Sequence, residues 1–478
     1  MAADIRGAEV GRAVTRTRAT TGRGTSRPRR RQAAARVGAV AAALALISAC
    51  APNPDGGASA ATVRSDATSA TTDPGATTGS GATTAATVTS PGSTAAGTPN
   101  PNATTASNGA TTSTGATVPV PAVGTMPPVL DASNVYSQAG ANMFSPSVAN
   151  ARRLVYVPSP LQGGSGTVDV IDQDTMEVVD TFIAGGIAQH VVPSWDMKTL
   201  YVNASAANRL VPIDPVTGKP GTPIPVQRPY NLYFTPDGTR AVVQNEHNNR
   251  LDYYDPVSWQ LIKSVPSTCK GNNHADWSAD GSYFLVTCEF SGDMLKVDTK
   301  SGEVLGKVKL ANGAMPQDVR LVPDGSKFYV ADMMNDGIWI LDGESLKVTG
   351  QIRTGKGTHG IYPSRDGSVM YAANRGRHMG DEARKSRPGE GSVSVINPKT
   401  DAVTATWTIP NGGSPDMGDV SADGTKLWLS GRYDSEVYVF DTATGALINR
   451  IPTSKEPHGL CVWPQPGRYS LGHTGNTR

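Results

Sequence analysis

The chain has 478 residues, with 43 basic and 41 acidic side chains and a formal net charge of +2. Ten of the basic and two of the acidic residues lie in the first 49 positions, so the remainder holds 33 basic and 39 acidic residues, a net charge of −6. An acidic surface disfavours nonspecific binding to nucleic acid, so no nucleic-acid partner is expected.

Residues 1–49 are predicted to be an export signal. An arginine-rich start precedes an apolar run at 37–47. That run is too short for a membrane-spanning helix, which needs roughly twenty residues, but it fits the apolar core of a secretory signal. The run ends in Ile47-Ser48-Ala49-Cys50, which resembles the lipobox of bacterial lipoproteins. The resemblance implies acyl chains on Cys50 and an anchor on the outer face of the cell membrane. An ordinary signal peptide cut near Ala49 is the alternative.

Residues 50–128 are predicted to be the lipidated cysteine followed by a tether. Ala, Thr, Gly, Ser, Pro and Asn make up almost all of this segment. Because it can bury very little apolar surface, we expect it to be disordered. Its expected role is to hold a folded domain away from the membrane.

Residues 129–478 carry an internal repeat. Turn signals recur near 194, 235, 278, 322, 364 and 421, for example "TPDGTRAVV" and "SADGSYFLV". Asp-Gly between alternating apolar runs is a strong hairpin signal. Each unit continues with two further strand-like segments, and four strands every forty-odd residues are typical of an all-β fold, the β-propeller.

The unit count favours seven four-stranded blades. Six complete units are followed by one more inner strand after His458, while the segment "ARRLVYVPS" supplies N-terminal strands. Joining the two ends in one blade closes the ring and removes open strand edges. Eight blades is the alternative, if residues 140–150 form an inner strand of their own.

The strands "YVNA" at 201, "YVAD" at 329 and "YAAN" at 371 resemble the repeat of YVTN-repeat, YncE-like β-propellers. The resemblance covers residues 130–478. It implies the propeller fold, and members of this family include cell-surface and periplasmic proteins. The repeat itself is mostly structural, so it implies little about function.

Polar residues recur where each inner strand reaches one mouth of the central channel. Histidine occupies the odd units of the repeat, and Asn or Asp occupies the even units. In chain order these residues are His190, Asn231, His274, Asp318, His359, Asp416 and His458. They could form a structural ring of hydrogen bonds or a ligand site. Within a ligand site, copper or zinc is the natural ion for the imidazoles of His190, His274, His359 and His458.

A second polar set is expected on the same face, from loops that follow the second strand of each blade. Its charged members include Glu246, Glu289, Arg375 and Arg432. Together with the channel residues they predict a mixed-charge funnel suited to a small ligand.

Two cysteines flank the turn "SADGSYF". Folding the hairpin brings Cys288 near Cys269, so a disulfide is expected in an oxidising compartment, and two buried thiols are the alternative.

These features predict an exported, lipid-anchored monomer whose propeller binds a small ligand, a metal or an envelope partner at the channel mouth. The alternative is an exported copper- or zinc-dependent enzyme that uses the same histidines. The chain lacks an obvious nucleophile–base motif, so enzymatic activity is left undecided, and a purely structural or adhesive envelope role is a third hypothesis.

Overall fold

The computed structural model describes residues 126–160, 165–381, 389–474 and 477. The predicted signal peptide, Cys50 and nearly all of the predicted tether lie outside these residues. None of the helices found in the described part has the length and hydrophobicity needed to span a bilayer.

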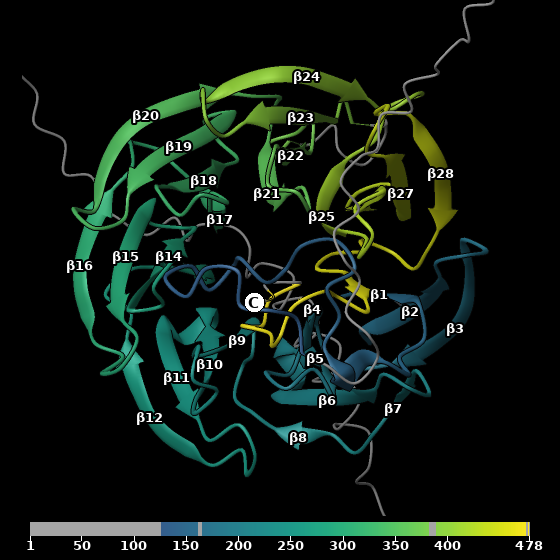
Figure 1. The fold of residues 1–478 in the computed structure, drawn as a ribbon, viewed down its shortest axis with the longest axis horizontal. Coiled ribbons are helices and arrows are strands. Elements are labelled where there is room, and N and C mark those ends of the chain that lie inside the picture. The colour runs from purple at the N-terminus through teal and green to yellow at the C-terminus, as the bar shows by residue number, and fades with distance from the viewer. Residues whose placement is uncertain (1–125, 161–164, 382–388, 475–476, 478) are drawn as a thin grey trace, which may run out of the picture. The chain divides into compact units, whose positions relative to one another are not determined.

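Seven antiparallel sheets surround a central channel, as Figure 1 shows. We number the blades by the order of their inner strands along the chain. Blade 1 contains β4 (Ala188–Pro193), β5 (Leu200–Ala204), β6 (Arg209–Asp214) and an outer strand split into β7 (Lys219–Pro220) and β8 (Ile224–Pro225). Blade 2 contains β9 (Asn231–Phe234), β10 (Ala241–Asn245), β11 (Arg250–Tyr254) and β12 (Leu261–Pro266). Blade 3 contains β13 (Asn272–Trp277), β14 (Tyr283–Cys288), β15 (Asp293–Asp298) and β16 (Val304–Lys309).

The remaining blades follow the same plan. Blade 4 contains β17 (Pro316–Leu321), β18 (Phe328–Asp332), β19 (Gly337–Asp342) and β20 (Lys347–Arg353). Blade 5 contains β21 (Thr358–Pro363), β22 (Met370–Asn374), β23 (Ser392–Asn397) and β24 (Ala402–Thr408). Blade 6 contains β25 (Pro415–Val420), β26 (Lys426–Gly431), β27 (Glu436–Asp441) and β28 (Leu447–Pro452). Blade 7 contains β29 (Cys461–Trp463), β1 (Leu154–Ser159), β2 (Thr167–Asp172) and β3 (Glu177–Ile183).

Blade 7 joins the two ends of the propeller, as predicted. Strand β29 pairs antiparallel with β1, with Leu154 opposite Trp463. The eight-bladed alternative is excluded, because residues 140–150 form a loop with the short 3-10 helix η1 (Pro146–Val148) instead of an inner strand.

The Asp-Gly turns between first and second strands explain why the repeat is so regular. In blade 3 the Ser278 hydroxyl donates to Asp280 Oδ1 at 2.6 Å, and the Ser282 amide donates to the same oxygen at 3.0 Å. Gly281 follows with a positive φ of 70°, a conformation that glycine adopts without steric cost. These turns define one face of the ring, which we call the turn face, and the opposite face is the loop face.

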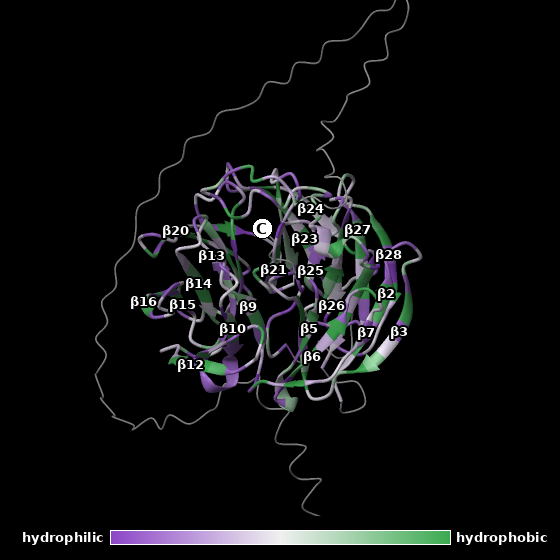
Figure 2. Ribbon diagram, turned by 60° about the horizontal axis from the view of Figure 1, so that its bottom comes forward, coloured by the Kyte–Doolittle hydropathy of each residue, from purple (hydrophilic) through white to green (hydrophobic). Residues whose placement is uncertain are grey.

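Apolar contacts between neighbouring blades make up the core. Trp277 and Phe284 of blade 3 pack with Tyr233 and Val242 of blade 2, and all four side chains are fully buried. Outer strands instead alternate between exposed and partly buried residues, and Figure 2 shows hydrophobic segments among the strands and hydrophilic segments in several loops. Each blade therefore depends on its neighbours for burial of its faces.

Cys269 and Cys288 form a disulfide across the blade 3 hairpin, with 6.0 Å between their Cα atoms. Cys461 is a free, buried thiol in β29.

Both described ends of the chain reach the channel. A strap of residues 126–145 crosses the turn face, where the Val135 amide donates to the Ala279 carbonyl and the Asn142 amide donates to the Ala422 carbonyl, both at 2.9 Å. The C-terminal tail pairs with β9 inside the ring, since the His473 amide donates to the Leu232 carbonyl at 2.9 Å. Figure 1 accordingly places the C-terminus near the centre of the ring.

Candidate functional site in the channel

The polar channel residues lie on inner strands, at or near β-bulges in the pairing of those strands. Register shifts occur between Ala188 and Val191 in β4, and between Asn272 and Ala275 in β13, and three further inner strands have the same feature. Such bulges redirect side chains and commonly occur at functional sites. Side chains of the second strand form hydrogen bonds to the backbone at such a bulge. In blade 1 the Asn203 amide donates to the His190 carbonyl at 3.3 Å.

All seven predicted channel residues are buried. Their exposed fractions run from 0% to 3% for His190, Asn231, His274, Asp318, His359, Asp416 and His458. The four histidines among them approach one another across blades. Ring centroids are 4.9 Å apart for His190 and His458, 5.2 Å for His190 and His274, and 5.8 Å for His359 and His458.

A fifth histidine, which the repeat alignment did not identify, joins this cluster from the C-terminal tail. The ring centroid of His473 lies 5.0 Å from that of His274 and 5.4 Å from that of His190. His473 lies beyond the last repeat unit, so the turn spacing gave no signal for its position.

His190, His274 and His473 form the most compact set. One nitrogen from each ring lies within 4.8 Å of the others, and no other set of three or more His, Cys, Asp or Glu side chains in the described residues meets this geometric criterion for a metal. Among the described residues, both ring nitrogens of His190 and His274 lack hydrogen-bond partners. Buried polar atoms are almost always paired, so these four nitrogens need an explanation.

The three imidazoles are held in their neutral form. Burial, and then the neighbouring histidines, hold the pKa of His190 and of His274 well below the usual value. Burial, and then Arg320, lower the pKa of His473 to about 4, against the opposing effect of Asp318. A neutral imidazole is the form that binds a metal ion.

His473 is also oriented by side chains of blades 2 and 4. The Asn231 side-chain amide donates to its Nδ1 at 2.9 Å, so the neutral ring carries its proton on Nε2, which has no hydrogen bond in the described residues. Asp318 Oδ1 lies 3.5 Å from that Nε2. These two partners fix the orientation of the His473 ring.

His359 and His458 differ from His190 and His274 because both have a carboxylate partner, Asp416. The His359 Nδ1 lies 2.9 Å from Asp416 Oδ1, and the His458 Nδ1 lies 2.8 Å from Asp416 Oδ2. Arg375 Nη2 completes the group at 2.6 Å. Burial alone would raise the pKa of Asp416, but Arg375 and the two imidazoles outweigh it and hold that pKa well below its usual range. His359, His458 and Arg375 therefore all contact the same buried carboxylate, that of Asp416.

Gly459 makes room for the cluster. A Cβ atom added at this residue would overlap the His190 ring at Nδ1. The absence of a side chain at Gly459 therefore lets blades 1 and 7 bring His190 and His458 close together.

Charged side chains occupy the loop face, where the funnel was predicted. The Asn273 amide donates to Glu289 at 2.9 Å, and Arg432 donates to the Glu456 carbonyl at 3.1 Å. Burial, and then the charge of Glu289, raise the pKa of Glu246 well above its usual value. Burial also raises the pKa of Glu289. Like charges close together disfavour ionisation of both carboxyl groups.

Comparison with known proteins supports the fold. The sequence model of the YNCE-like beta-propeller family matches residues 167–466. No curated protein matches the sequence at a significant level.

The solved structures that match the chain share little sequence identity with it. A functionally unknown protein from Desulfotomaculum acetoxidans is 17% identical, with a TM-score of 0.52 over 64% of this chain and 98% of its own. Kuenenia stuttgartiensis hydrazine synthase is 18% identical, with a TM-score of 0.47 over 56% of this chain and 86% of its own. Dihydro-heme d1 dehydrogenase NirN in complex with DHE is 15% identical, with a TM-score of 0.47 over 68% and 77% of the two chains.

Proposed function

This chain belongs to the YNCE-like β-propeller family, and from that premise we propose that it is an exported, lipid-anchored protein that binds a copper or zinc ion in its propeller channel. The arginine-rich, apolar start and the segment ending at Cys50 support export and anchoring. The carrying observation for metal binding is that one nitrogen each of the buried His190, His274 and His473 lies within 4.8 Å of the others.

A metal ion accounts for the unpartnered nitrogens better than a structural ring does. The structural arrangement is already present at Asp416, where His359 and His458 each have a carboxylate oxygen. His190 and His274 have no comparable partner among the described residues. Imidazole suits zinc and copper, and three imidazoles around a four-coordinate ion leave one position for water or a small ligand.

A metal-dependent exported enzyme is the second candidate function. The observation in its favour is the Glu246–Glu289 pair on the loop face, because burial raises the pKa of both carboxyl groups and so favours a bound proton. A positioned carboxyl group can transfer that proton to a small substrate.

The test is metal analysis of the full chain, extracted in detergent and purified without a histidine tag. After dialysis against zinc or copper, we expect about one tightly held ion per chain, as for a single three-histidine site. His190→Ala, His274→Ala and His473→Ala should each lose it. His247→Ala is the matched control, because this exposed histidine lies outside the cluster. Equal metal content in the wild type and in a His190→Ala/His274→Ala variant with an unchanged β-sheet spectrum would overturn the proposal.

Export and anchoring are tested separately. Radiolabelled palmitate should be incorporated into the wild-type protein in cells but not into Cys50→Ser, while Cys461→Ser should be labelled like the wild type. Labelling of Cys50→Ser would contradict the anchor.

A further inference from the structure

A partly open cavity lies at the other end of the channel, on the turn face. This turn-face cavity has a volume of about 330 Å³ and is lined by the strap, by the ends of inner strands and by the C-terminal tail. Its size matches the lower range of small-molecule sites. It is separate from the histidine cluster, because none of the five histidines lines it.

The wall of the turn-face cavity is mostly apolar, with a few charged groups. Its apolar lining includes Tyr136 and Met143 of the strap and Leu321 and Pro323 of blade 4. The strap is fixed there, since the Tyr136 hydroxyl donates to Asp276. An apolar wall with a few oriented polar groups is the usual composition of a site for a small organic molecule.

Asp419 provides a polar atom without a partner. Its Oδ1 accepts hydrogen bonds from the Val420 amide at 2.7 Å and from Arg365 Nη2 at 3.3 Å. Its Oδ2 has no partner in the described part of the chain, although the residue is only 6% exposed. The buried Thr474 hydroxyl, which also lines the turn-face cavity, likewise has no partner there. A buried carboxylate oxygen without a donor is costly, so a ligand that donates to it gains correspondingly.

The charges lining the cavity favour a cation. Three carboxyl groups line it, those of Asp276, Asp366 and Asp419, against the guanidinium groups of Arg320 and Arg365. The positive charge of Arg320 is further offset by Asp318, 3.3 Å away outside the cavity. An anionic ligand would increase this negative excess, whereas a monocation would balance it.

We propose that the turn-face cavity binds a small organic monocation, an ammonium group carried on an apolar body. The ammonium donates to Asp419 Oδ2 and to the Thr474 hydroxyl, and the apolar body lies between Tyr136, Met143 and Leu321. The site is independent of the proposed metal centre, so failure of either proposal leaves the other standing.

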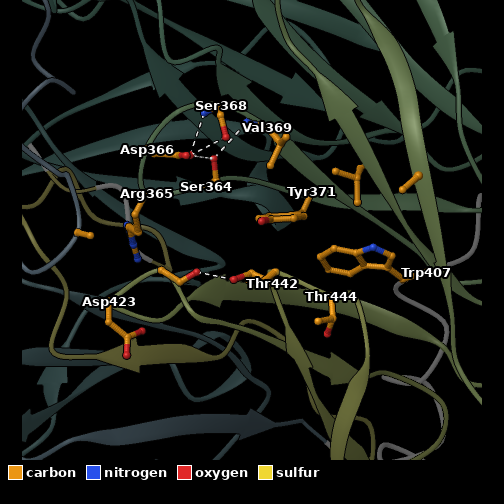
Figure 3. Close-up of a pocket in the computed structure, with 15 residues that line it drawn as sticks. Ser364, Arg365, Asp366, Ser368, Val369, Tyr371, Trp407, Asp423, Thr442 and Thr444 are labelled. Carbon is orange, nitrogen blue, oxygen red and sulfur yellow. Dashed lines mark hydrogen bonds between the residues drawn. The ribbon is translucent and has the colours of Figure 1, made fainter. Parts of the chain in front are cut away.

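A larger groove nearby lacks this feature. It has a volume of about 560 Å³ and lies between blades 5 and 6, with Tyr371 and Trp407 on one side, as Figure 3 shows. Two of its hydroxyl groups already have partners: that of Ser364 donates to Asp366 in the same turn at 2.6 Å, and that of Thr442 donates to the Gly424 carbonyl of another turn at 2.6 Å. The turn-face cavity is therefore the better candidate for a specific ligand.

The probe set for the experiment is 2-phenylethylamine, the neutral 2-phenylethanol and the anionic 3-phenylpropionate, compared by isothermal titration calorimetry on the full chain. We expect saturable binding of the amine. The alcohol should bind about tenfold more weakly or worse, because it cannot form the charge-assisted hydrogen bond to Asp419. The acid should bind most weakly, because its negative charge adds to that of the cavity. Asp419→Asn should weaken the amine by a similar factor. Asp174→Asn is the matched control, because that carboxylate is exposed on blade 7.

A wild-type measurement covers the case in which Asp419→Asn does not fold. Asp419 faces Arg365, Arg320 and the Cys461 thiol. The amine keeps its charge between pH 6 and pH 8 while Asp419 loses its proton, so amine binding should tighten across that range and alcohol binding should not. The proposal would be overturned if the amine did not bind, or if it bound no more tightly than the alcohol. Strongest binding of the acid, or an amine affinity unchanged by Asp419→Asn, would overturn it as well.

Discussion

The substitution Asp419→Asn makes a sharp test of the electrostatics in the channel. Burial raises the pKa of this carboxyl from its ordinary 3.8 to about 7, against the opposing effect of Arg365. Between these two values the folded protein holds a proton that the unfolded chain has released. Stability therefore falls as pH rises from about 4 to 7, and this contribution is constant above pH 7.

The magnitude follows from the pKa difference. Each pH unit well inside the window changes the free energy of unfolding by about 1.4 kcal/mol. Because the carboxyl is already half ionised at pH 7, the change from pH 5 to pH 7 is about 2 kcal/mol. The amide side chain of the variant has no proton to lose in this range. The stability of the wild type relative to Asp419→Asn should accordingly fall by about 2 kcal/mol over this range.

The assay is urea unfolding followed by tryptophan fluorescence at pH 5, 6, 7 and 8, with both proteins in the same buffers. Taking the difference between the two proteins cancels the titration of all other groups that the substitution leaves unchanged. A difference that stays constant from pH 5 to pH 7, or one that grows with pH, would refute the reasoning.

Three further predictions concern packing and covalent structure. In Gly459→Ala the added methyl group should overlap the His190 ring, which should cost about 1–3 kcal/mol in urea unfolding. The variant should also lose zinc binding in dialysis, and full zinc content would contradict this prediction. Trp428→Ala should cost about 3–5 kcal/mol in the same unfolding assay, since this fully buried side chain packs blade 6 against the closing blade, and a cost below about 1 kcal/mol would mean that closure does not depend on it. Cys269→Ala/Cys288→Ala should lose about 3 kcal/mol for a bridge across a sequence separation of 19, and calorimetry showing an unchanged Tm would count against a stabilising bridge.

The blades could be predicted from the sequence because their signals are local. Asp280 and Gly281 specify their turn through bonds to residues close by in the chain, and the same chemistry recurs in other blades. The repeat also placed His190 and His274 at equivalent positions, so their approach in the channel follows from pseudo-symmetry.

The remaining parts of both sites depend on tertiary structure. His473 reaches the cluster only because the C-terminal tail pairs with β9, and the spacing of the repeat contains nothing about that pairing. Asp419 lies beyond a register shift in β25, so strict strand alternation did not indicate that it lines the channel. Two of the four histidines first grouped as metal ligands, His359 and His458, have their Nδ1 atoms at Asp416, a distinction that only side-chain geometry can make.

The most direct test is an anomalous diffraction map at the zinc edge from crystals grown with zinc. The account predicts one strong peak on the channel axis, bonded to nitrogens of His190, His274 and His473 at about 2.1 Å. A channel without a peak, with zinc only on surface carboxylates or on His247, would contradict it.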